Sequence, residues 1–162
     1  LSLRNISKQC GVTHNAIYRH FENKEKMIDC CQEYVTENIT NYLKKSIEGL
    51  DISEIDTLNK FGYAYISFYK KYPTYFSFLY RNSAVKIIFS MDEINDNYPP
   101  FELFRKICCA LTEKRNMTKE YGIKRCIQFW SLMHGTISLI VSPNVELVGE
   151  WEEYLKDIFH FV

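Results

Sequence analysis

The chain has 162 residues, of which 46% are apolar and 25% charged, so it is long and apolar enough to fold around a core. It carries 20 basic and 20 acidic residues, and the resulting net charge of zero excludes a strong overall attraction to nucleic acid. Glycine and proline are scarce, with six and four residues, which predicts an all-α fold of long helices. The longest apolar runs are far shorter than the ~20 residues of a membrane-spanning helix, so we expect no membrane segment.

Residues 2–28 have the pattern of a helix-turn-helix, two helices joined by a short turn. Ser2 is positioned to cap the first helix and Thr13 the second, because a hydroxyl can accept a hydrogen bond from a first-turn amide. Gly11 is expected to end the first helix, where a left-handed backbone costs a glycine little. The apolar residues that recur at helical spacing and are expected to face inward are Leu3, Ile6, Cys10, Ile17 and Phe21.

The outward side of the second helix is rich in hydrogen-bond donors and aromatic surface, the groups that contact base edges and phosphates. We therefore predict a DNA-binding surface made of Thr13, His14, Asn15, Tyr18, Arg19, His20 and Lys24. The expected phosphate contacts are Thr13, Tyr18, His20 and Lys24, and the expected base contacts are His14 and Asn15. From this pattern alone, the alternative is a solvent-exposed polar hairpin with no role in DNA binding.

Residues 11–28, GVTHNAIYRHFENKEKMI, resemble the signature of the tetracycline-repressor (TetR) family of bacterial transcription regulators. The family has Gly-Val-Ser/Thr, apolar-Tyr, His-Phe and Lys-Glu/Asp where this chain has Gly11-Val12-Thr13, Ile17-Tyr18, His20-Phe21 and Lys24-Glu25. The resemblance implies a DNA-binding regulator, by default a repressor, that a small effector releases from its operator. It also implies a further helix before the helix-turn-helix, which we expect in the natural protein because this sequence begins after it. The alternative is an interaction module that has lost DNA binding.

A long helix is predicted at residues 24–49, with Asn23 as its N-cap and apolar residues at every third or fourth position. A helix of ~25 residues spans about 37 Å, which is enough to join two domains. We predict a helix-turn-helix DNA-binding domain in residues 1–48, incomplete at its N-terminus. A ligand-binding and dimerisation domain is predicted in residues 49–162.

The second domain is predicted to consist of helices separated by proline and turn residues. The expected helices are 54–71, capped by Ser53, then 74–82, 99–116, 118–142 and 145–161, the last capped by Asn144. Pro73 is expected to stop the first of them. Residues 83–99 are the least regular, and we predict a mobile loop at residues 91–97.

The helix predicted at 118–142 carries two stripes of residues. The larger stripe contains Trp130 and His134 and is expected to face the interior of its own subunit, where aromatic side chains line a cavity for a small hydrophobic effector, neutral or cationic. The predicted ligand-binding residues are Tyr65, Phe68, Tyr69, Phe76, Phe89, Phe104, Cys108, Trp130 and His134. The alternative is that these aromatic residues form an ordinary core. The run FWSLMHGTISLI also resembles the C-terminal domain of a TetR subgroup marked by a Trp…His-Gly pattern, here Trp130, His134 and Gly135.

The second stripe consists of small residues, which allow another helix to approach closely. We predict that this stripe packs against the same helix of a second copy and that the last helix completes a four-helix interface. The predicted dimer-interface residues are Ser131, Gly135, Ser138, Ser142, Trp151, Leu155 and Ile158. A two-fold homodimer fits a palindromic double-stranded DNA operator with half-sites about 34–36 Å apart.

The six cysteines form no C-x-x-C pair, so we predict no zinc site, no other cofactor, and buried free thiols in a reducing cytoplasm. A thiol redox sensor on the same scaffold is an alternative, through Cys30, Cys31, Cys108 and Cys109. The sequence contains no paired carboxylates at useful spacing, no glycine-rich phosphate loop and no nucleophile–histidine pattern, so an enzyme is not expected. The four histidines are scattered and predict no metal site.

Overall fold

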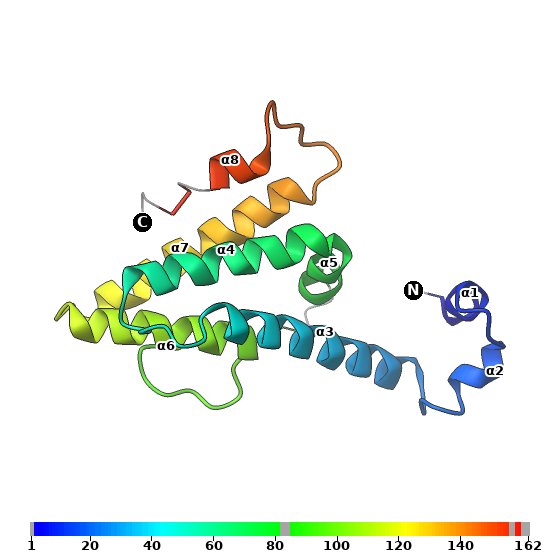
Figure 1. The fold of residues 1–162 in the computed structure, drawn as a ribbon. Helices are drawn as coiled ribbons and strands as arrows, with labels where there is room; N and C mark the ends of the chain where they lie inside the picture. Colours follow the sequence, from blue (N-terminus) through cyan, green and yellow to red (C-terminus); the bar gives the residue numbers. More distant parts are fainter. Residues whose placement is uncertain (1, 82–84, 156–157, 160–162) are drawn as a thin grey trace. The chain divides into compact units, whose positions relative to one another are not determined.

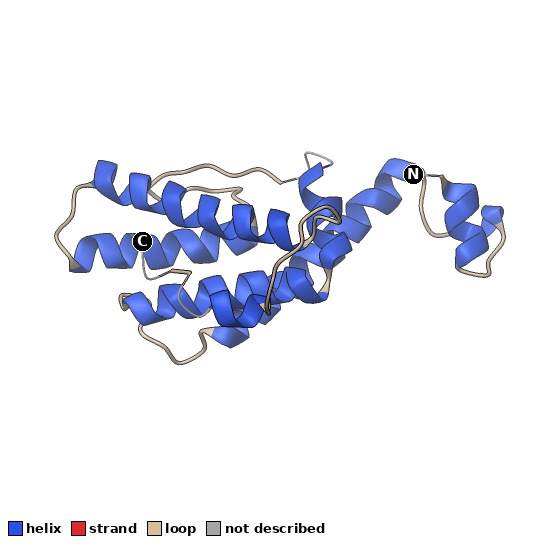
Figure 2. Cartoon of the chain, turned by 90° about the horizontal axis from the view of Figure 1, so that it is seen from above, coloured by secondary structure: helices blue, strands red, loops and turns tan. Residues whose placement is uncertain are grey.

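The computed structural model describes residues 2–81, 85–155 and 158–159 of the chain, and within them it contains helices and loops but no strand (Figures 1 and 2). The all-α fold class is therefore confirmed. The helices are α1 (Leu3–Gln9), α2 (His14–Ile17), α3 (Lys24–Ser46), α4 (Ile55–Lys71), α5 (Pro73–Arg81), α6 (Pro99–Lys114), α7 (Lys119–Ile140) and α8 (Trp151–Leu155). None of the helices in this described part is long and apolar enough to cross a membrane.

The chain divides into two compact units, residues 1–37 and residues 38–162. The division falls inside α3, whereas the sequence placed it near the C-terminal end of this helix, at residue 48. Helix α3 is continuous over 23 residues and contributes to both units. Its first part packs in the N-terminal unit through Met27, and Ile39 and Leu43 are fully buried in the C-terminal unit.

The N-terminal unit is a helix-turn-helix built on a small apolar cluster. Its buried members are Leu3, Ile17 and Met27, and Ile6, Phe21 and Ile28 pack against them. Gly11 has a φ of 68°, the left-handed conformation expected of the glycine that ends α1. The amide of Val12 then donates to the carbonyl of Ser7 at 3.0 Å, which closes the turn.

The helix caps of this unit differ partly from the prediction. Ser2 and Thr13 occupy N-cap positions, but neither side chain makes a capping hydrogen bond. Asn23 does cap α3, because its Oδ1 accepts from the amide of Lys26 at 2.8 Å. Cys10 was expected to face inward, yet it is exposed because it lies at the C-cap of α1, where the chain turns away from the cluster.

In the C-terminal unit, α4, α6 and α7 pack against one another, and α5 packs against α4. The sequence folds this way because each of these helices has an aromatic stripe at helical spacing. Among the largest fully buried side chains are Phe61, Tyr65 and Tyr69 of α4, Phe101 and Phe104 of α6, and Phe129 of α7. Glycine allows α6 and α7 to approach closely, since a Cβ added at Gly122 would lie 2.6 Å from the hydroxyl oxygen of Thr112.

Several of the predicted helix boundaries need correction. Helix α4 begins after Glu54, and Ser53 does not cap it, because the Ser53 hydroxyl donates to the Asp51 carboxylate at 2.7 Å. Pro73 ends α4, as predicted, but it is also the first residue of α5, a position where proline loses no helical hydrogen bond.

The last helix is much shorter than the predicted 145–161. Helix α8 covers Trp151–Leu155, and Asn144 does not cap a helix. Gly149 has a φ of 112°, which no helical residue adopts, and the Tyr154 hydroxyl donates to the carbonyl of Val148 at 3.1 Å. Residues 156–157 and 160–161 of the predicted helix lie outside the described residues.

The loop between α5 and α6, predicted at 91–97 to be mobile, is attached to the helical core by hydrogen bonds. Within the loop, the Asn97 side chain accepts from the amide of Ile88 at 3.0 Å and donates to its carbonyl at 3.1 Å. Arg105 is 5% exposed and donates from Nη1 to the carbonyl of Asp92 at 2.9 Å. Its guanidinium also pairs with Glu102, and this hydrogen bond lowers the pKa of the Glu102 carboxyl and raises that of Arg105.

Candidate nucleic-acid interface and effector region

Helix α2 packs on the apolar cluster of the N-terminal unit through its buried side. Ile17 is 8% exposed and lies in this cluster with Leu3 and Met27. After Ile17 the chain makes a turn in which the amides of His20 and Phe21 both donate to the Ile17 carbonyl, at 3.1 and 3.0 Å. The buried side therefore determines which side chains of this segment face outward.

The predicted DNA contacts lie mainly on the outward side. The exposed side chains among them are Thr13, Asn15, Tyr18, Arg19 and His20, and Lys24 is half-buried. Tyr18 is 50% exposed, so its ring is not part of the core. His14 is the first residue of α2, but its side chain lies outside the described residues. Positions 15, 18 and 19 share one side of a helical turn, which gathers an amide, a phenol and a guanidinium on a single surface.

Lys24 adds positive charge at the start of the long helix. It is the first residue of α3, where unpaired backbone amides and the helix dipole already favour an anion. The neighbouring Lys26 pairs with Asp29 at 3.9 Å. Lys24 and the helix N-terminus thus favour a phosphate at this end of α3, whereas Glu25 in the same turn opposes it.

A second cluster of polar atoms lies inside the aromatic core of the C-terminal unit. The Tyr65 hydroxyl lies 2.9 Å from Nε2 of His134 and 2.7 Å from the Tyr80 hydroxyl. The hydroxyls of Tyr69 and Tyr98 are 3.5 Å apart. We call Tyr65, Tyr69, Tyr80, Tyr98 and His134 the tyrosine–histidine cluster.

The groups of this cluster are kept neutral by their surroundings. Burial lowers the pKa of His134 to about 4. It also raises the pKa values of Tyr65, Tyr69 and Tyr80 well above the ordinary value for tyrosine. At neutral pH the cluster therefore offers hydrogen-bond donors and acceptors without charge.

Aromatic rings surround His134 closely. Its ring centroid lies 4.6 Å from that of Tyr80, 4.9 Å from Trp130, and 5.4 Å from Phe76. Trp130 in turn contacts Phe104, with ring centroids 5.1 Å apart. These rings fill the space around the imidazole, so the region has the packing of a core.

The predicted ligand-binding residues are only partly gathered here. Tyr65, Tyr69, Phe76, Trp130 and His134 lie together, and Phe104 and Phe68 pack one ring further out. Phe89 contacts Phe101 and not the cluster, and Cys108 lines a different hollow. The sequence reasoning did not include Tyr80 and Tyr98. Tyr80 follows Phe76 by four residues on the same helix, and that spacing would have identified it.

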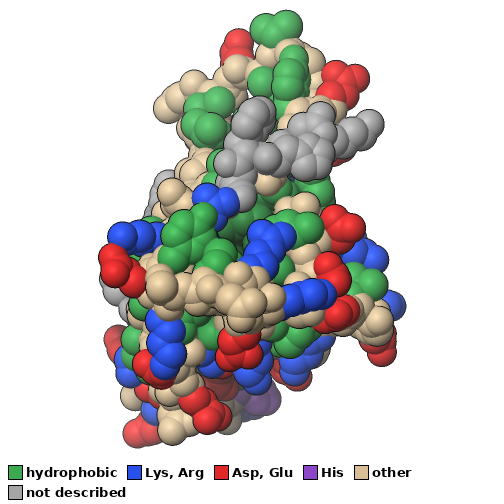
Figure 3. All heavy atoms as spheres, turned by 90° about the vertical axis from the view of Figure 1, so that its left-hand side faces the viewer, with side chains coloured by type: hydrophobic (Ala, Val, Ile, Leu, Met, Phe, Trp, Pro, Cys, Tyr) green, Lys and Arg blue, Asp and Glu red, His purple; other side chains and the backbone are tan. Residues whose placement is uncertain are grey.

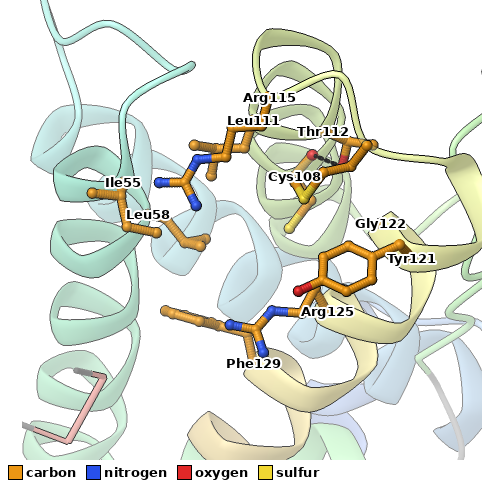
Figure 4. Close-up of a pocket in the computed structure, with 11 residues that line it drawn as sticks. Ile55, Leu58, Cys108, Leu111, Thr112, Arg115, Tyr121, Gly122, Arg125 and Phe129 are labelled. Carbon is orange, nitrogen blue, oxygen red and sulfur yellow. Dashed lines mark hydrogen bonds between the residues drawn. The ribbon is translucent and has the colours of Figure 1, made fainter. Parts of the chain in front are cut away.

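The hollow that Cys108 lines lies between the N-terminal part of α4, the C-terminal part of α6 and the N-terminal part of α7 (Figure 4). Its cavity volume is about 80 Å³, and it is partly open to solvent. Apolar side chains from the three helices form its walls, and Arg115, Tyr121 and Arg125 lie at its rim. Of the predicted ligand-binding residues, Cys108 alone contributes to it.

The predicted dimer seam on α7 faces solvent. Ser131, Gly135 and Ser138 are exposed, and a Cβ added at Gly135 would meet no atom within 4 Å. The large apolar side chains of Ile127 and Leu139, which lie on the same helix, are 43% and 50% exposed. The other predicted interface residues are less accessible: Ser142, Trp151 and Ile158 are half-buried and Leu155 is buried.

The six cysteines are all free, but they are not all buried as predicted. Cys10, Cys30 and Cys31 are exposed because the N-terminal unit is small and these positions lie outside its apolar cluster. Burial is the main cause of the raised pKa values of Cys31, Cys108 and Cys109. Redox-sensor thiols usually have a lowered pKa, so Cys31, Cys108 and Cys109 do not fit this role. Among the described residues no group of three possible metal ligands occurs.

The start of the chain matches a known protein family. Residues 1–30 match the family described as bacterial regulatory proteins, tetR family. No curated protein matches the chain significantly. The match covers the helix-turn-helix and the start of α3, so it supports a TetR-type DNA-binding domain and a role in transcription regulation.

Proposed function

Taking the N-terminal unit as a TetR-type DNA-binding domain, we propose that this protein is a homodimeric repressor that a small effector releases from a palindromic operator. The observation that carries the proposal is the exposed polar side of α2 and of the turn after it. Ile17, on the opposite side of α2, is buried and fixes this orientation. In this reading His14 and Asn15 contact base edges in the major groove, and Arg19 lies along the edge of the groove. The phosphates that flank the groove are contacted by Thr13, Tyr18, His20 and Lys24.

Helix α3 is the proposed connection between effector and DNA. It runs without interruption from Lys24 to Ser46, and its second half is anchored by Ile39 and Leu43, both 0% exposed. A rearrangement of the helices that pack on this half would move the whole of α3, including Lys24 at its first position. In a dimer such a movement changes the distance between the two recognition helices. An effector that prefers the released state by about 1.4 kcal/mol weakens DNA binding tenfold.

The effector is proposed to be a small, uncharged aromatic compound that binds at the tyrosine–histidine cluster. The cluster combines apolar ring faces with neutral hydroxyl and imidazole groups, which suits a ligand with one or two hydrogen-bonding groups. Because the rings are packed against one another, the ligand has to displace at least one of them. The binding of such a compound is thereby coupled to a rearrangement of α4, α5 and α7, the helices that carry these rings.

The DNA-binding proposal is tested with Lys24→Ala and Tyr18→Phe. Duplexes are first selected from a random library with the full chain, and affinities are then measured by fluorescence anisotropy at several salt concentrations. Lys24→Ala is expected to weaken binding about tenfold at low salt and to reduce the salt slope by about one, since one phosphate contact is lost. Tyr18→Phe removes one hydroxyl donor and is expected to weaken binding by roughly fivefold.

Lys44→Ala is the matched control, because Lys44 is an exposed lysine on the same helix but in the C-terminal unit. Its affinity and salt slope should equal those of the wild type. Unchanged binding by both Lys24→Ala and Tyr18→Phe would show that this side of the helix-turn-helix does not face DNA.

The dimer proposal predicts that α7 pairs with α7 of a second copy along Ser131, Gly135 and Ser138. Gly135→Glu introduces a charge into this seam, and the space beside Gly135 accepts a side chain without a clash inside the subunit. The wild type is expected to sediment as a dimer at micromolar concentration and Gly135→Glu as a monomer. Ser67→Glu, an exposed substitution on α4, should leave the dimer intact. A wild-type chain that sediments only as a monomer contradicts the proposal.

A further inference from the structure

The first part of α3 carries two adjacent cysteines that the proposed regulator does not use. Cys30 and Cys31 are both exposed, and both have free thiols. We propose that this pair binds a trivalent arsenical with one aryl substituent, an arylarsonous acid, through two arsenic–sulfur bonds. The proposal concerns a separate site and depends neither on DNA binding nor on the tyrosine–histidine cluster.

The two thiols lie close together because they follow one another on a continuous helix. Burial raises the pKa of the Cys31 thiol, and so does the neighbouring Cys30, because two thiolates side by side would repel each other. Consecutive Cα atoms are about 3.8 Å apart, closer than the roughly 4.4 to 6.8 Å between disulfide-linked residues. A disulfide within the pair is therefore disfavoured, whereas a bridge lengthened by one arsenic atom can join side chains that diverge around the helix.

Two thiols are the number of ligands that a singly substituted arsenical needs. Thiolate sulfur is a soft ligand, and trivalent arsenic is a soft acceptor that forms three bonds, one of which the aryl carbon already occupies. Among the residues that the structure describes, no group of three histidine, cysteine or carboxylate side chains could hold a metal ion. The pair therefore suits an arylarsonous acid better than a metal ion that requires four protein ligands.

The binding reaction needs no oxidant or reductant. Each of the two arsenic–hydroxyl bonds of the arsonous acid is exchanged for an arsenic–sulfur bond, and each thiol proton leaves with a hydroxyl group as water. Two water molecules are released, and the arsenic stays trivalent. The raised pKa of Cys31, which does not suit a redox sensor, is compatible with this exchange, because the thiol loses its proton as the bond to arsenic forms.

The surroundings of the pair accept an uncharged aromatic group. Tyr34 is 61% exposed and follows Cys31 by three residues, so it lies on the same side of α3 as a bound aryl group. Just before the pair, Lys26 and Asp29 form an ion pair at 3.9 Å. On the face of the C-terminal unit shown in Figure 3, Lys and Arg side chains are likewise interspersed with Asp and Glu. An arylarsonous acid is uncharged at neutral pH, so a surface of mixed charge neither attracts nor repels it.

The test uses phenylarsine oxide, which forms phenylarsonous acid in water, and the full chain with its thiols reduced. Native mass spectrometry measures how much phenylarsenic stays bound as glutathione, a monothiol competitor, is added. The apparent affinity of Cys30→Ser and of Cys31→Ser is expected to be at least about tenfold lower than that of the wild type, since each variant leaves one sulfur ligand. Ethane-1,2-dithiol, which supplies two sulfur ligands itself, should remove the group from the wild type.

Alkylation locates the bound group. After phenylarsine oxide has been added, N-ethylmaleimide labels the thiols that remain free, and the labels are assigned by mass spectrometry of tryptic peptides. In the wild type, Cys30 and Cys31 should be protected together, and the exposed Cys10 should be labelled.

Cys10→Ser is the matched control, because it removes a single exposed thiol from the same unit, and its affinity should stay within about twofold of the wild type. Thermal melts of all the variants identify any loss of folding, which these exposed substitutions are not expected to cause. Equal retention of phenylarsenic by the wild type, Cys30→Ser and Cys31→Ser overturns the proposal, as does full labelling of both cysteines in its presence. DNA affinity is measured separately, so a failure of the regulator proposal leaves this result interpretable.

Discussion

Replacing Phe104 by alanine is expected to lower the free energy of unfolding by about 3 to 5 kcal/mol, the usual cost of deleting a buried phenylalanine ring. Phe104 is 0% exposed, and its ring centroid lies 5.1 Å from that of Trp130 and 5.8 Å from that of Phe129. The substitution removes these contacts and leaves a cavity in the centre of the C-terminal unit. Urea denaturation followed by far-ultraviolet circular dichroism measures the loss.

This result also decides between the two readings of the aromatic stripe that the sequence left open. A solid core loses several kcal/mol when Phe104 is truncated, whereas a side chain that lines a cavity loses less, because fewer neighbouring atoms surround it. Val148→Ala is the control, because Val148 is 93% exposed and its truncation should change stability by less than about 0.5 kcal/mol. A small effect of Phe104→Ala would contradict the packing described around Trp130.

The second large effect is a dependence of stability on pH that comes from His134. Burial lowers its folded pKa from the ordinary 6.5 to about 4, so the unfolded chain binds more protons than the folded one between these values. The neutral imidazole is thus favourable above pH 6.5, and its contribution is lost as the pH falls toward 4. A shift of this size corresponds to about 3 kcal/mol between pH 7 and pH 4.

The measurement compares the wild type with His134→Gln, whose side chain can still bond the Tyr65 hydroxyl but does not titrate. Carboxylates titrate equally in both proteins, so their contributions cancel in the difference. Urea denaturation at pH 7, 6, 5 and 4 should show the stability of the wild type, relative to the variant, falling by about 3 kcal/mol. A difference that stays constant over this range would mean that His134 is accessible to solvent and that the tyrosine–histidine cluster is open.

The helices of the N-terminal unit were predictable because local chemistry determines them. Gly11 marks the turn through its left-handed backbone, and Asn23 caps α3 with its own side chain. Ile17 had to face inward because it is the one large apolar residue of α2. The exposure of Tyr18 and His20 follows from the same periodicity.

The predictions were wrong where a single residue interrupted a regular apolar pattern or where the fold lacked the space to bury a side chain. Apolar spacing predicted a helix across residues 145–161, but Gly149 adopts a φ of 112° and the helix begins only at Trp151. Composition predicted buried cysteines, yet Cys30 and Cys31 lie beyond the reach of the small apolar cluster. A hydrophobic pattern indicates which side chains favour burial, but the space available in the fold decides which of them are buried.

The sequence by itself determined that this protein is helical, that its first segment is a helix-turn-helix similar to that of the TetR family, and that aromatic residues fill the larger unit. These properties depend on neighbouring residues, whose spacing along a helix is known in advance. Only the tertiary structure decided that Tyr80 joins His134 and that Arg115 and Arg125 share one opening. Tyr80 and His134 lie on different helices, as do the two arginines, so their proximity depends on how those helices pack, which no local pattern specifies.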